Sequence, residues 1–166
     1  MEEMRVYLVN LGTYNEGNPK GAWFTLPIDY ENVKEKLGLN GSYEKYLIHD
    51  YELPFAVGEY EAIAELNKYY EMIKEMKSDI TTNLKPILKE WFCDMEELYE
   101  NRDKIIFHAG CSNMEEFAVQ SLEESGALSS LPETLRHHFN YASYARDMEV
   151  NGFFLEVSGG ILEYSA

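Results

Sequence analysis

The first 58 residues alternate short apolar runs with segments that form turns. The runs rich in β-forming residues predict three strands, at 5–11, 22–26 and 46–51. Asparagine, glycine and proline residues concentrated in 13–21 predict a long loop between the first two strands. Asp29 as an N-terminal cap and Gly38 as a C-terminal stop predict one helix before the third strand. The pattern therefore predicts a β-β-α-β module at the N-terminus.

From residue 59 the apolar positions follow a helical period. One face of the first predicted helix is apolar over an arc of about 80°, at Ile63, Leu66, Tyr70 and Ile73. The opposite face is acidic over an arc of about 120°, at Glu61, Glu65, Glu71 and Glu75. Lys68 lies within the acidic arc. This helix is therefore predicted to have an apolar face and a mainly acidic face.

Two further helices are predicted before residue 103. The first covers about 79–92, where Pro86 forces a kink or a break. The second covers about 94–102 and brings four acidic side chains together, at Asp94, Glu96, Glu97 and Glu100. Repulsion between carboxylates at this spacing costs roughly a few tenths of a kcal/mol per pair. The pattern indicates a central helical module with a large excess of acid.

The remaining residues combine helices with a β-hairpin. Ser112 and Glu115 have the spacing of a capping box, and Gly126 can end the helix that follows. Pro132 is suited to the first position of another helix, which is predicted to continue to about residue 149. A Ser-Gly-Gly turn separates the last two predicted strands, at 153–157 and 161–164. Together the elements predict an α+β chain of three small modules, at 1–58, 59–103 and 104–166.

Acidic residues outnumber basic ones by 30 to 14 among 166 residues, which gives a formal net charge of -16 at pH 7. The hydrophobic fraction is 45%, which is enough to offset chain entropy in a folded protein. A field this negative repels nucleic acid and anionic membranes, because binding to either depends on Lys and Arg side chains. We therefore expect no direct nucleic-acid or membrane partner and expect basic protein surfaces as partners instead.

The cysteine content and the apolar runs indicate the compartment. The two cysteines, Cys93 and Cys111, are too few for a disulfide scaffold. No apolar run approaches the ~20 residues needed to cross a bilayer. The N-terminal residues lack the pattern of a secretion signal. These features predict a cytoplasmic protein.

The groups that could carry chemistry do not have the spacing of a catalytic or metal site. Carboxylate pairs of the glycosidase kind arise by chance among 30 acidic residues. His49 and Asp50 are neighbours in a predicted strand, so their side chains are expected to point to opposite faces. His108 with Cys111 does not have the spacing of a zinc site. We therefore expect no catalysis, no metal and no cofactor.

Both ends of the chain resemble the ArdA antirestriction proteins. Near the N-terminus the matching runs are VYLVNLGTYNEG at 6–17, GAWFTLP at 21–27 and IHDYE at 48–52. Near the C-terminus the matching run is YASYARDME at 141–149, together with the glycine-rich hairpin after it. The resemblance spans nearly the full length of the chain.

The resemblance implies a function and an assembly. Members of the family are carried by conjugative elements such as conjugative transposons, and they block type I restriction-modification enzymes by mimicking DNA. The family resemblance implies an elongated, curved homodimer of small α+β modules, joined through the C-terminal modules. The counterpart of the family's antirestriction motif is expected around 122–135, where dimer packing and direct enzyme contact both stay open.

Three hypotheses for the function differ in class. The first is a non-enzymatic inhibitor that occupies the DNA groove of a type I methyltransferase core. Its expected phosphate surrogates are Glu61, Glu65, Glu71, Glu75, Asp94, Glu97, Glu100, Glu116 and Glu123. The second is a general acidic interaction module for another basic or DNA-binding protein. The third is a small hydrolase with a carboxylate pair, which would lose its function on a single acid-to-amide change.

The C-terminal module holds more apolar and aromatic residues than so small a module can bury. This excess predicts a homodimer. The candidates for its interface are Leu122, Leu128, Leu131, Leu135, Tyr141, Tyr144 and Phe153.

Overall fold

The computed structural model describes residues 2–166 and divides into two compact units, Met1–Lys85 and Pro86–Ala166. The boundary falls within helix α5 (Leu84–Glu90). Each unit contains one antiparallel three-stranded sheet with helices, so the α+β class predicted from the sequence is confirmed. The division into three modules at residues 58 and 103 stays a prediction.

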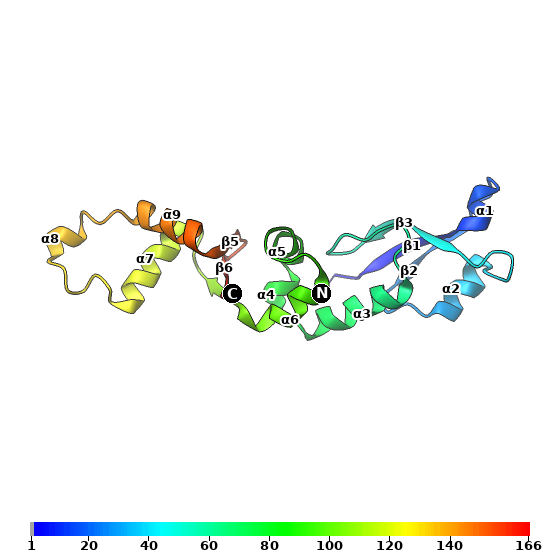
Figure 1. The fold of residues 1–166 in the computed structure, drawn as a ribbon, viewed down its shortest axis with the longest axis horizontal. Helices are drawn as coiled ribbons and strands as arrows, with labels where there is room; N and C mark the ends of the chain where they lie inside the picture. Colours follow the sequence, from blue (N-terminus) through cyan, green and yellow to red (C-terminus); the bar gives the residue numbers. More distant parts are fainter. Residues whose placement is uncertain (1) are drawn as a thin grey trace. The chain divides into compact units, whose positions relative to one another are not determined.

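The sheet of the first unit has the strand order β2-β1-β3 (Figure 1). Its strands are β1 (Arg5–Asn10), β2 (Gly21–Thr25) and β3 (Tyr46–Glu52), which confirms the three strands expected from the sequence. Both neighbours pair antiparallel with β1. The register between β1 and β3 shifts at Tyr7 and Leu8, because Tyr7 pairs with Asp50 and Leu8 with Ile48. His49 is therefore the extra residue of a β-bulge.

A short helix, α1 (Leu11–Asn15), covers the last residue of the expected first strand and the start of the expected loop. Asn10 caps it, because its Oδ1 atom accepts hydrogen bonds from the N–H groups of Gly12 at 3.0 Å and Thr13 at 3.2 Å. The prediction of an uninterrupted loop was wrong. One helical turn of five residues has no apolar repeat to mark it, and its cap stands at the end of a strand.

The core of the first unit lies between the sheet and helices on one side of it. Helix α2 (Tyr30–Leu37) packs against β2, and Figure 1 shows α2 and α3 (Ile63–Glu75) on the same side of the sheet. Val6, Leu8, Val33, Leu37 and Leu66 are fully buried there. The side chain of Asp29 caps α2, and Gly38 ends it with φ 65°, as the sequence predicted.

The helical segment after α3 is divided earlier than expected. The single predicted helix over 79–92 is two helices in the structure, α4 (Ser78–Thr81) and α5. Pro86 is the third residue of α5, where the N–H that proline lacks needs no partner within the helix. The break that proline enforces therefore lies upstream, at residues 82–83.

The sheet of the second unit has the order β4-β6-β5. Helix α6 (Met95–Asn101) and the short 3-10 helix η1 (Arg102–Lys104) lead into β4 (Ile105–Ala109). The chain ends with the predicted hairpin of β5 (Phe153–Val157) and β6 (Gly160–Tyr164). Ile161 and Leu162 of the central strand are fully buried.

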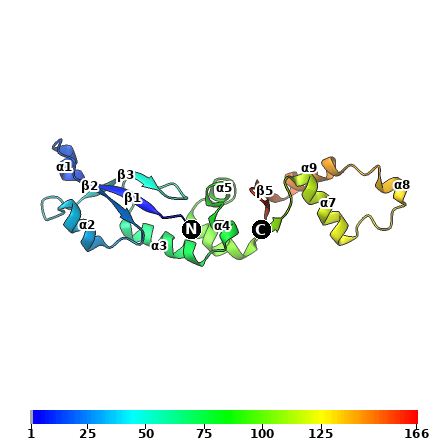
Figure 2. The same ribbon diagram turned by 180° about the vertical axis from the view of Figure 1, so that it is seen from behind.

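Helices α7 (Met114–Ser125) and α9 (Tyr141–Asn151) pack side by side in the second unit (Figure 2). Their shared core includes Met114, Phe117, Ala118 and Ala145. Helix α7 ends at Gly126 as predicted, but its N-terminal cap is one residue later than the predicted Ser112. The cap is Asn113, and its Oδ1 accepts from the N–H of Glu116 at 2.9 Å.

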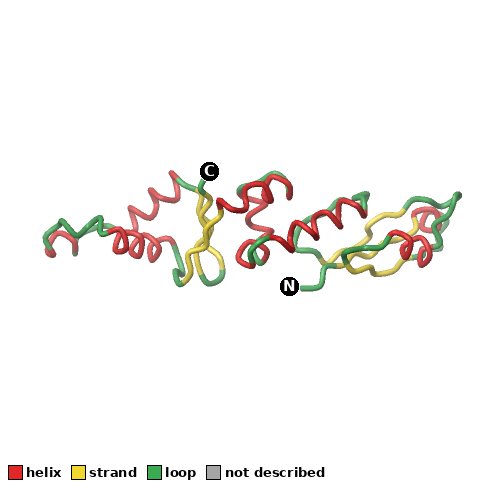
Figure 3. Tube along the Cα trace, turned by 90° about the horizontal axis from the view of Figure 1, so that it is seen from below, coloured by secondary structure: helices red, strands yellow, loops and turns green. Residues whose placement is uncertain are grey.

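The helix predicted from Pro132 to about residue 149 is two helices. Pro132 occupies the N-cap position of the one-turn helix α8 (Glu133–Arg136) without a side-chain hydrogen bond, whereas the Asn140 side chain caps α9. Figure 3 shows α8 as a short helix with loop on both sides. Leu131 is half-buried and Leu135 is 55% exposed. A longer helix here would lack the buried face that stabilises helices in proteins.

Candidate functional site

Four of the proposed surrogate acids lie in the first unit. Glu65, Glu71 and Glu75 are in α3, whereas Glu61 precedes the helix and its N-terminal cap Ala62. The opposite face of α3 buries Ile63, Leu66 and Ile73, so the predicted division into an apolar and an acidic face holds within the helix. Glu71 and Glu75 are exposed, and Glu61 and Glu65 are half-buried.

Lysine side chains one turn away compensate part of this acid. Nζ of Lys68 lies 3.5 Å from Oε2 of Glu65, and Nζ of Lys74 lies 3.2 Å from Oε2 of Glu71. Both pairs are solvent-exposed, and such pairs exchange readily with other partners because each is worth only ~0–1 kcal/mol. The α3 surface is therefore acidic but locally balanced.

Three more acids lie at or near α6 in the second unit. Asp94 caps the helix through a 2.8 Å hydrogen bond from the N–H of Glu97 to its Oδ1. Oε2 of Glu97 accepts from the N–H of Cys93 at 2.8 Å. Glu100 is exposed on the same helix. Two of these three carboxylates thus also accept hydrogen bonds from backbone N–H groups at the N-terminus of the helix.

The last two acids lie on α7. Glu116 is exposed, and its Oε2 accepts from the N–H of Ser112 at 2.7 Å. Glu123 is exposed near the C-terminal end of the helix. The nine acids therefore divide into four in the first unit and five in the second, on helix surfaces and helix ends.

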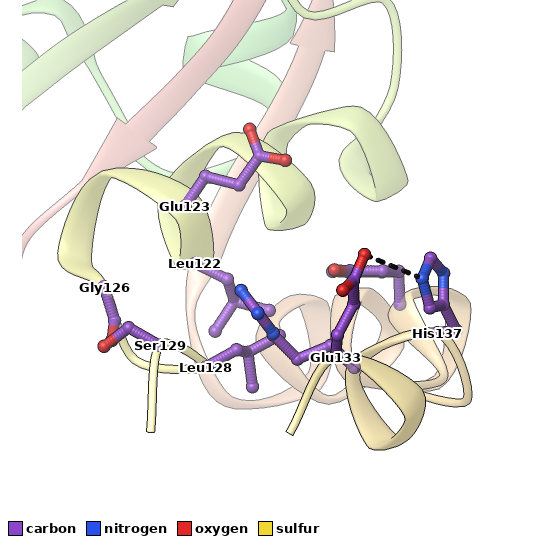
Figure 4. A pocket seen from close by; sticks show the side chains of 9 residues that line it. Leu122, Glu123, Gly126, Leu128, Ser129, Glu133 and His137 are labelled. Atoms are coloured by element: carbon purple, nitrogen blue, oxygen red, sulfur yellow. Dashed lines mark hydrogen bonds and ion pairs between the residues drawn. The ribbon is translucent and has the colours of Figure 1, made fainter. Parts of the chain in front are cut away.

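Three of the seven interface candidates line a hollow of about 510 Å³ in the second unit. Leu122, Leu128 and Tyr141 line it together with polar residues, as Figure 4 shows for the first two. Glu133 and His137 face each other across its edge, with Oε1 and Nε2 3.8 Å apart. Leu122 is buried, and Leu128 and Tyr141 are half-buried, so the hollow exposes little of the expected apolar excess.

The exposure of the other candidates varies. Tyr144 is 37% exposed and Phe153 is 50% exposed. The sequence did not single out Val150 and Ile106, which are exposed by 78% and 46%. Val150 lies near the C-terminal end of α9. In so short a helix, the apolar pattern cannot distinguish an exposed valine from a buried one, so the sequence did not indicate its exposure.

The candidate chemical groups are held in structural contacts. Nε2 of His108 lies 2.7 Å from Oε2 of Glu163 across neighbouring strands. Sγ of the buried Cys111 donates to Oε1 of Gln120 at 2.8 Å, whereas Cys93 is exposed. Among residues 2–166, no three His, Cys, Asp or Glu side chains gather as a metal-binding group. No helix in this range is long and apolar enough to cross a bilayer.

His49 and Asp50 differ from the sequence expectation. They line one hollow together, although neighbours in a regular strand point to opposite faces. The β-bulge at His49 interrupts this alternation and is the physical reason for the difference. Oδ1 of Asp50 accepts from the N–H of Tyr51 at 2.8 Å.

Direct hydrogen bonds shift the pKa values of Arg5, Glu52 and Tyr43 in the first unit. Arg5 donates to both carboxylate oxygens of Glu52, which lowers the pKa of Glu52 and raises that of Arg5. The Tyr43 hydroxyl donates to Oε1 of Glu16 at 2.7 Å, which raises the pKa of Tyr43. These pairs tie strands and loops together.

In the second unit, burial raises the pKa of the Cys111 thiol, and the carboxylates of Glu116 and Glu124 raise it further. Nucleophilic cysteines have lowered pKa values, so Cys111 has the character of a core residue.

The fold and its surface define an acidic α+β protein whose exposed carboxylates suit it to bind basic surfaces of other proteins. A family model for the antirestriction protein ArdA matches residues 6–163. The chain therefore belongs to the ArdA antirestriction family, whose members are non-enzymatic DNA mimics that inhibit type I restriction enzymes. This membership confirms the resemblance noted in the sequence and excludes the hydrolase hypothesis. No curated protein matches the chain.

Proposed function

We propose that this chain inhibits type I restriction-modification enzymes by occupying the DNA groove of the methyltransferase core in place of DNA. The observation that supports this most directly is that helices of both units present exposed carboxylates, with Glu71 on α3, Glu100 on α6 and Glu123 on α7. A groove that binds DNA is lined by Lys and Arg side chains that neutralise phosphates. Exposed carboxylates on helix surfaces are negatively charged like phosphates, so they can bind the same Lys and Arg side chains.

The nine acids act in this proposal as a distributed field. A field that sums over many exposed groups attracts a basic groove over a distance set by the ionic strength. The pairs Glu65–Lys68 and Glu71–Lys74 lower the local charge in the free protein. On binding, Lys and Arg side chains of the enzyme would compete with Lys68 and Lys74 for these carboxylates.

The active form in this proposal is a homodimer joined through the second unit. The support is the exposure of large apolar side chains there, above all Leu135, Phe153 and Val150. Water-exposed side chains of this size are stabilised when a second copy covers them. Each copy adds a net charge of -16, so dimerisation also doubles the acid that faces the enzyme.

The cellular setting follows from the target. Type I enzymes act on DNA in the cytoplasm, so the chain is proposed to work there. Protection of incoming mobile DNA, such as a conjugative transposon, is the benefit that inhibition would provide.

A competition titration tests the proposal. A purified type I methyltransferase core is bound to a fluorescent DNA duplex that carries its target site, and the chain is added. We expect displacement of the duplex at near-equimolar dimer, and the apparent inhibition constant should rise in proportion to the DNA concentration. Inhibition that is independent of DNA concentration would contradict competition and would favour a general acidic interaction module that binds elsewhere on the enzyme.

A further inference from the structure

The first unit contains a hollow of about 480 Å³ beside β3, the strand that contains the β-bulge. We name it the tyrosine–carboxylate hollow, after its aromatic and acidic lining residues. Among the residues that line it are Tyr14, His49, Asp50, Tyr51, Glu59 and Tyr60, and apolar side chains line it as well. They come from α1, from β3 and from the segment before α3. Each of these segments belongs to the same unit, so the hollow is formed within a single compact body.

The rings of the hollow are unusually open to water. Tyr60 is 72% exposed, Tyr14 is 44% exposed and Tyr51 is 37% exposed. A core role does not explain three tyrosines with this exposure, because each leaves much of its apolar ring in water. Their negative ring faces are available to attract a cation.

The two carboxylates of the hollow have no basic partner. Within residues 2–166, neither Asp50 nor Glu59 forms an ion pair with a Lys or Arg side chain. This sets them apart from Glu65 and Glu71, which are paired on α3. The hollow therefore combines exposed aromatic rings with uncompensated negative charge.

The same surface already holds one guanidinium group. The Arg5 guanidinium lies over the Trp23 ring, 4.9 Å from its centroid, and Nη2 of Arg5 donates to Oε1 of Glu52 at 3.0 Å. The Tyr7 ring connects this pair to the hollow, because its centroid lies 5.5 Å from that of Trp23 and 6.2 Å from that of His49. Arg5 is itself part of β1, and its contacts show that a ring and a carboxylate on this sheet can together contact one guanidinium.

We propose that the tyrosine–carboxylate hollow binds an arginine side chain of the DNA-contacting surface of the target enzyme. This inference rests on the proposed competition for that surface. Arginine fits better than lysine because its planar guanidinium stacks on rings and forms forked hydrogen bonds with carboxylates. A phosphate group has no aromatic ring, so the contact would add affinity that a pure phosphate mimic lacks.

The test compares two double variants with the same charge. Asp50→Asn/Glu59→Gln removes the carboxylates of the hollow, and Glu35→Gln/Glu44→Gln removes two exposed carboxylates elsewhere in the first unit. We expect the hollow variant to raise the inhibition constant about three- to tenfold over the control variant. Tyr60→Leu, which retains bulk but removes the ring, should raise it about two- to fivefold. Equal inhibition constants for the two double variants would overturn the proposal.

A direct binding measurement keeps the proposal testable without the enzyme. L-argininamide is titrated into the isotope-labelled chain and followed by NMR, with glycinamide as the control cation. We expect saturable shifts at Tyr14, Tyr51 and Tyr60 with argininamide, and their loss in Asp50→Asn/Glu59→Gln. Identical shifts with glycinamide would overturn the proposal. A wild-type chain that binds argininamide in the hollow but fails to displace DNA would refute the proposed competition and not the hollow.

Discussion

The carboxylate of Glu116 accepts a hydrogen bond from the backbone N–H of Ser112 at 2.7 Å, immediately before the cap of α7. Glu97 repeats this arrangement before α6, where its Oε2 lies 2.8 Å from the N–H of Cys93. Both acids, and the cap Asp94, are among the proposed phosphate surrogates. Their charge and their role at a helix end must therefore be separated by experiment.

Asp94 offers this separation through two substitutions. Asp94→Asn retains an oxygen that can accept the 2.8 Å hydrogen bond from the N–H of Glu97, whereas Asp94→Ala removes it. Both remove the same charge. We expect Asp94→Ala to lower the free energy of unfolding by about 1 kcal/mol and Asp94→Asn by a few tenths, measured by urea denaturation. Both should weaken inhibition equally and slightly. If only Asp94→Ala weakened inhibition, the capping hydrogen bond of Asp94, and not its charge, would be what inhibition requires.

The proposed surrogate acids should act together and not singly. Glu65→Gln or Glu100→Gln alone should cost ~0–1 kcal/mol of binding free energy, because each is one exposed charge in a field. Changing Glu61, Glu65, Glu71 and Glu75 to Gln in steps should weaken inhibition progressively and flatten its dependence on salt. Competition titrations at several salt concentrations measure both. One variant that abolishes inhibition on its own, or a fourfold variant with the wild-type constant, would contradict a distributed field.

The proposed homodimer should respond to salt in a characteristic direction. Two chains of net charge -16 repel each other, so moderate salt should tighten their association by screening. Sedimentation at micromolar concentration measures this, and a single species near 19.3 kDa would count against the dimer. Leu135→Ser should weaken association, because Leu135 is 55% exposed. Thr134→Ser, next to it, should leave association unchanged.

Asn10 should be critical for the stability of the first unit. It is 1% exposed, caps α1, and its Nδ2 donates to the carbonyl of Leu37 at 3.0 Å. Asn10→Ala leaves these backbone groups without a partner, and we expect a loss of about 1–3 kcal/mol in the free energy of unfolding. The exposed Asn32→Ala is the control and should change it by less than about 0.5 kcal/mol. Equal losses for both would show that the contacts of Asn10 are not stabilising.

The Arg5–Glu52 pair should make stability depend on pH in one direction. The hydrogen bond from Arg5 lowers the pKa of Glu52 below its usual value of 4.5 in the folded state. A group with a lowered folded pKa contributes stability above its unfolded pKa and loses it as the pH falls through its folded pKa. Glu52→Gln should therefore lower the melting temperature at neutral pH.

This difference between wild type and Glu52→Gln should disappear well below pH 4.5. Thermal unfolding followed by circular dichroism from about pH 7 to about pH 3 measures it. Glu44→Gln, an exposed change in the same unit, should not show this loss. A difference in melting temperature between wild type and Glu52→Gln that persists at about pH 3 would contradict this prediction. It would mean that packing of the Glu52 side chain, and not its charge, stabilises the contact.

Strong local signals made much of the fold predictable. Asp29 with Gly38 marked both ends of α2, Gly126 marked the end of α7, and the Ser-Gly-Gly turn marked the hairpin. Each is a backbone requirement met within a few residues. The short helix α1 was missed because a single turn has no period to detect. The residues of α8 were predicted as helix, but the break between α8 and α9 was missed. Asn140, the cap of α9, was the signal that could have divided the last predicted helix.

The candidate site was predictable in part, for a different reason. Helical periodicity placed Glu65, Glu71 and Glu75 opposite the buried face of α3, as the structure shows. It could not show that Glu97 and Glu116 fold back on backbone N–H groups, because a cap depends on the residue where the helix begins. The tyrosine–carboxylate hollow depends on a bulge and on segments distant in sequence, which no local pattern reveals.

The contrast between the two cysteines has a practical consequence. Cys111 is buried and its thiol has a raised pKa, whereas Cys93 is exposed directly before α6. A maleimide dye at neutral pH therefore reacts with one accessible thiol per chain, that of Cys93. The native sequence needs no engineered cysteine for site-specific labelling. A fluorophore at Cys93 would stand beside Asp94 and Glu97. It would report, in real time, when an enzyme covers the acidic end of this helix.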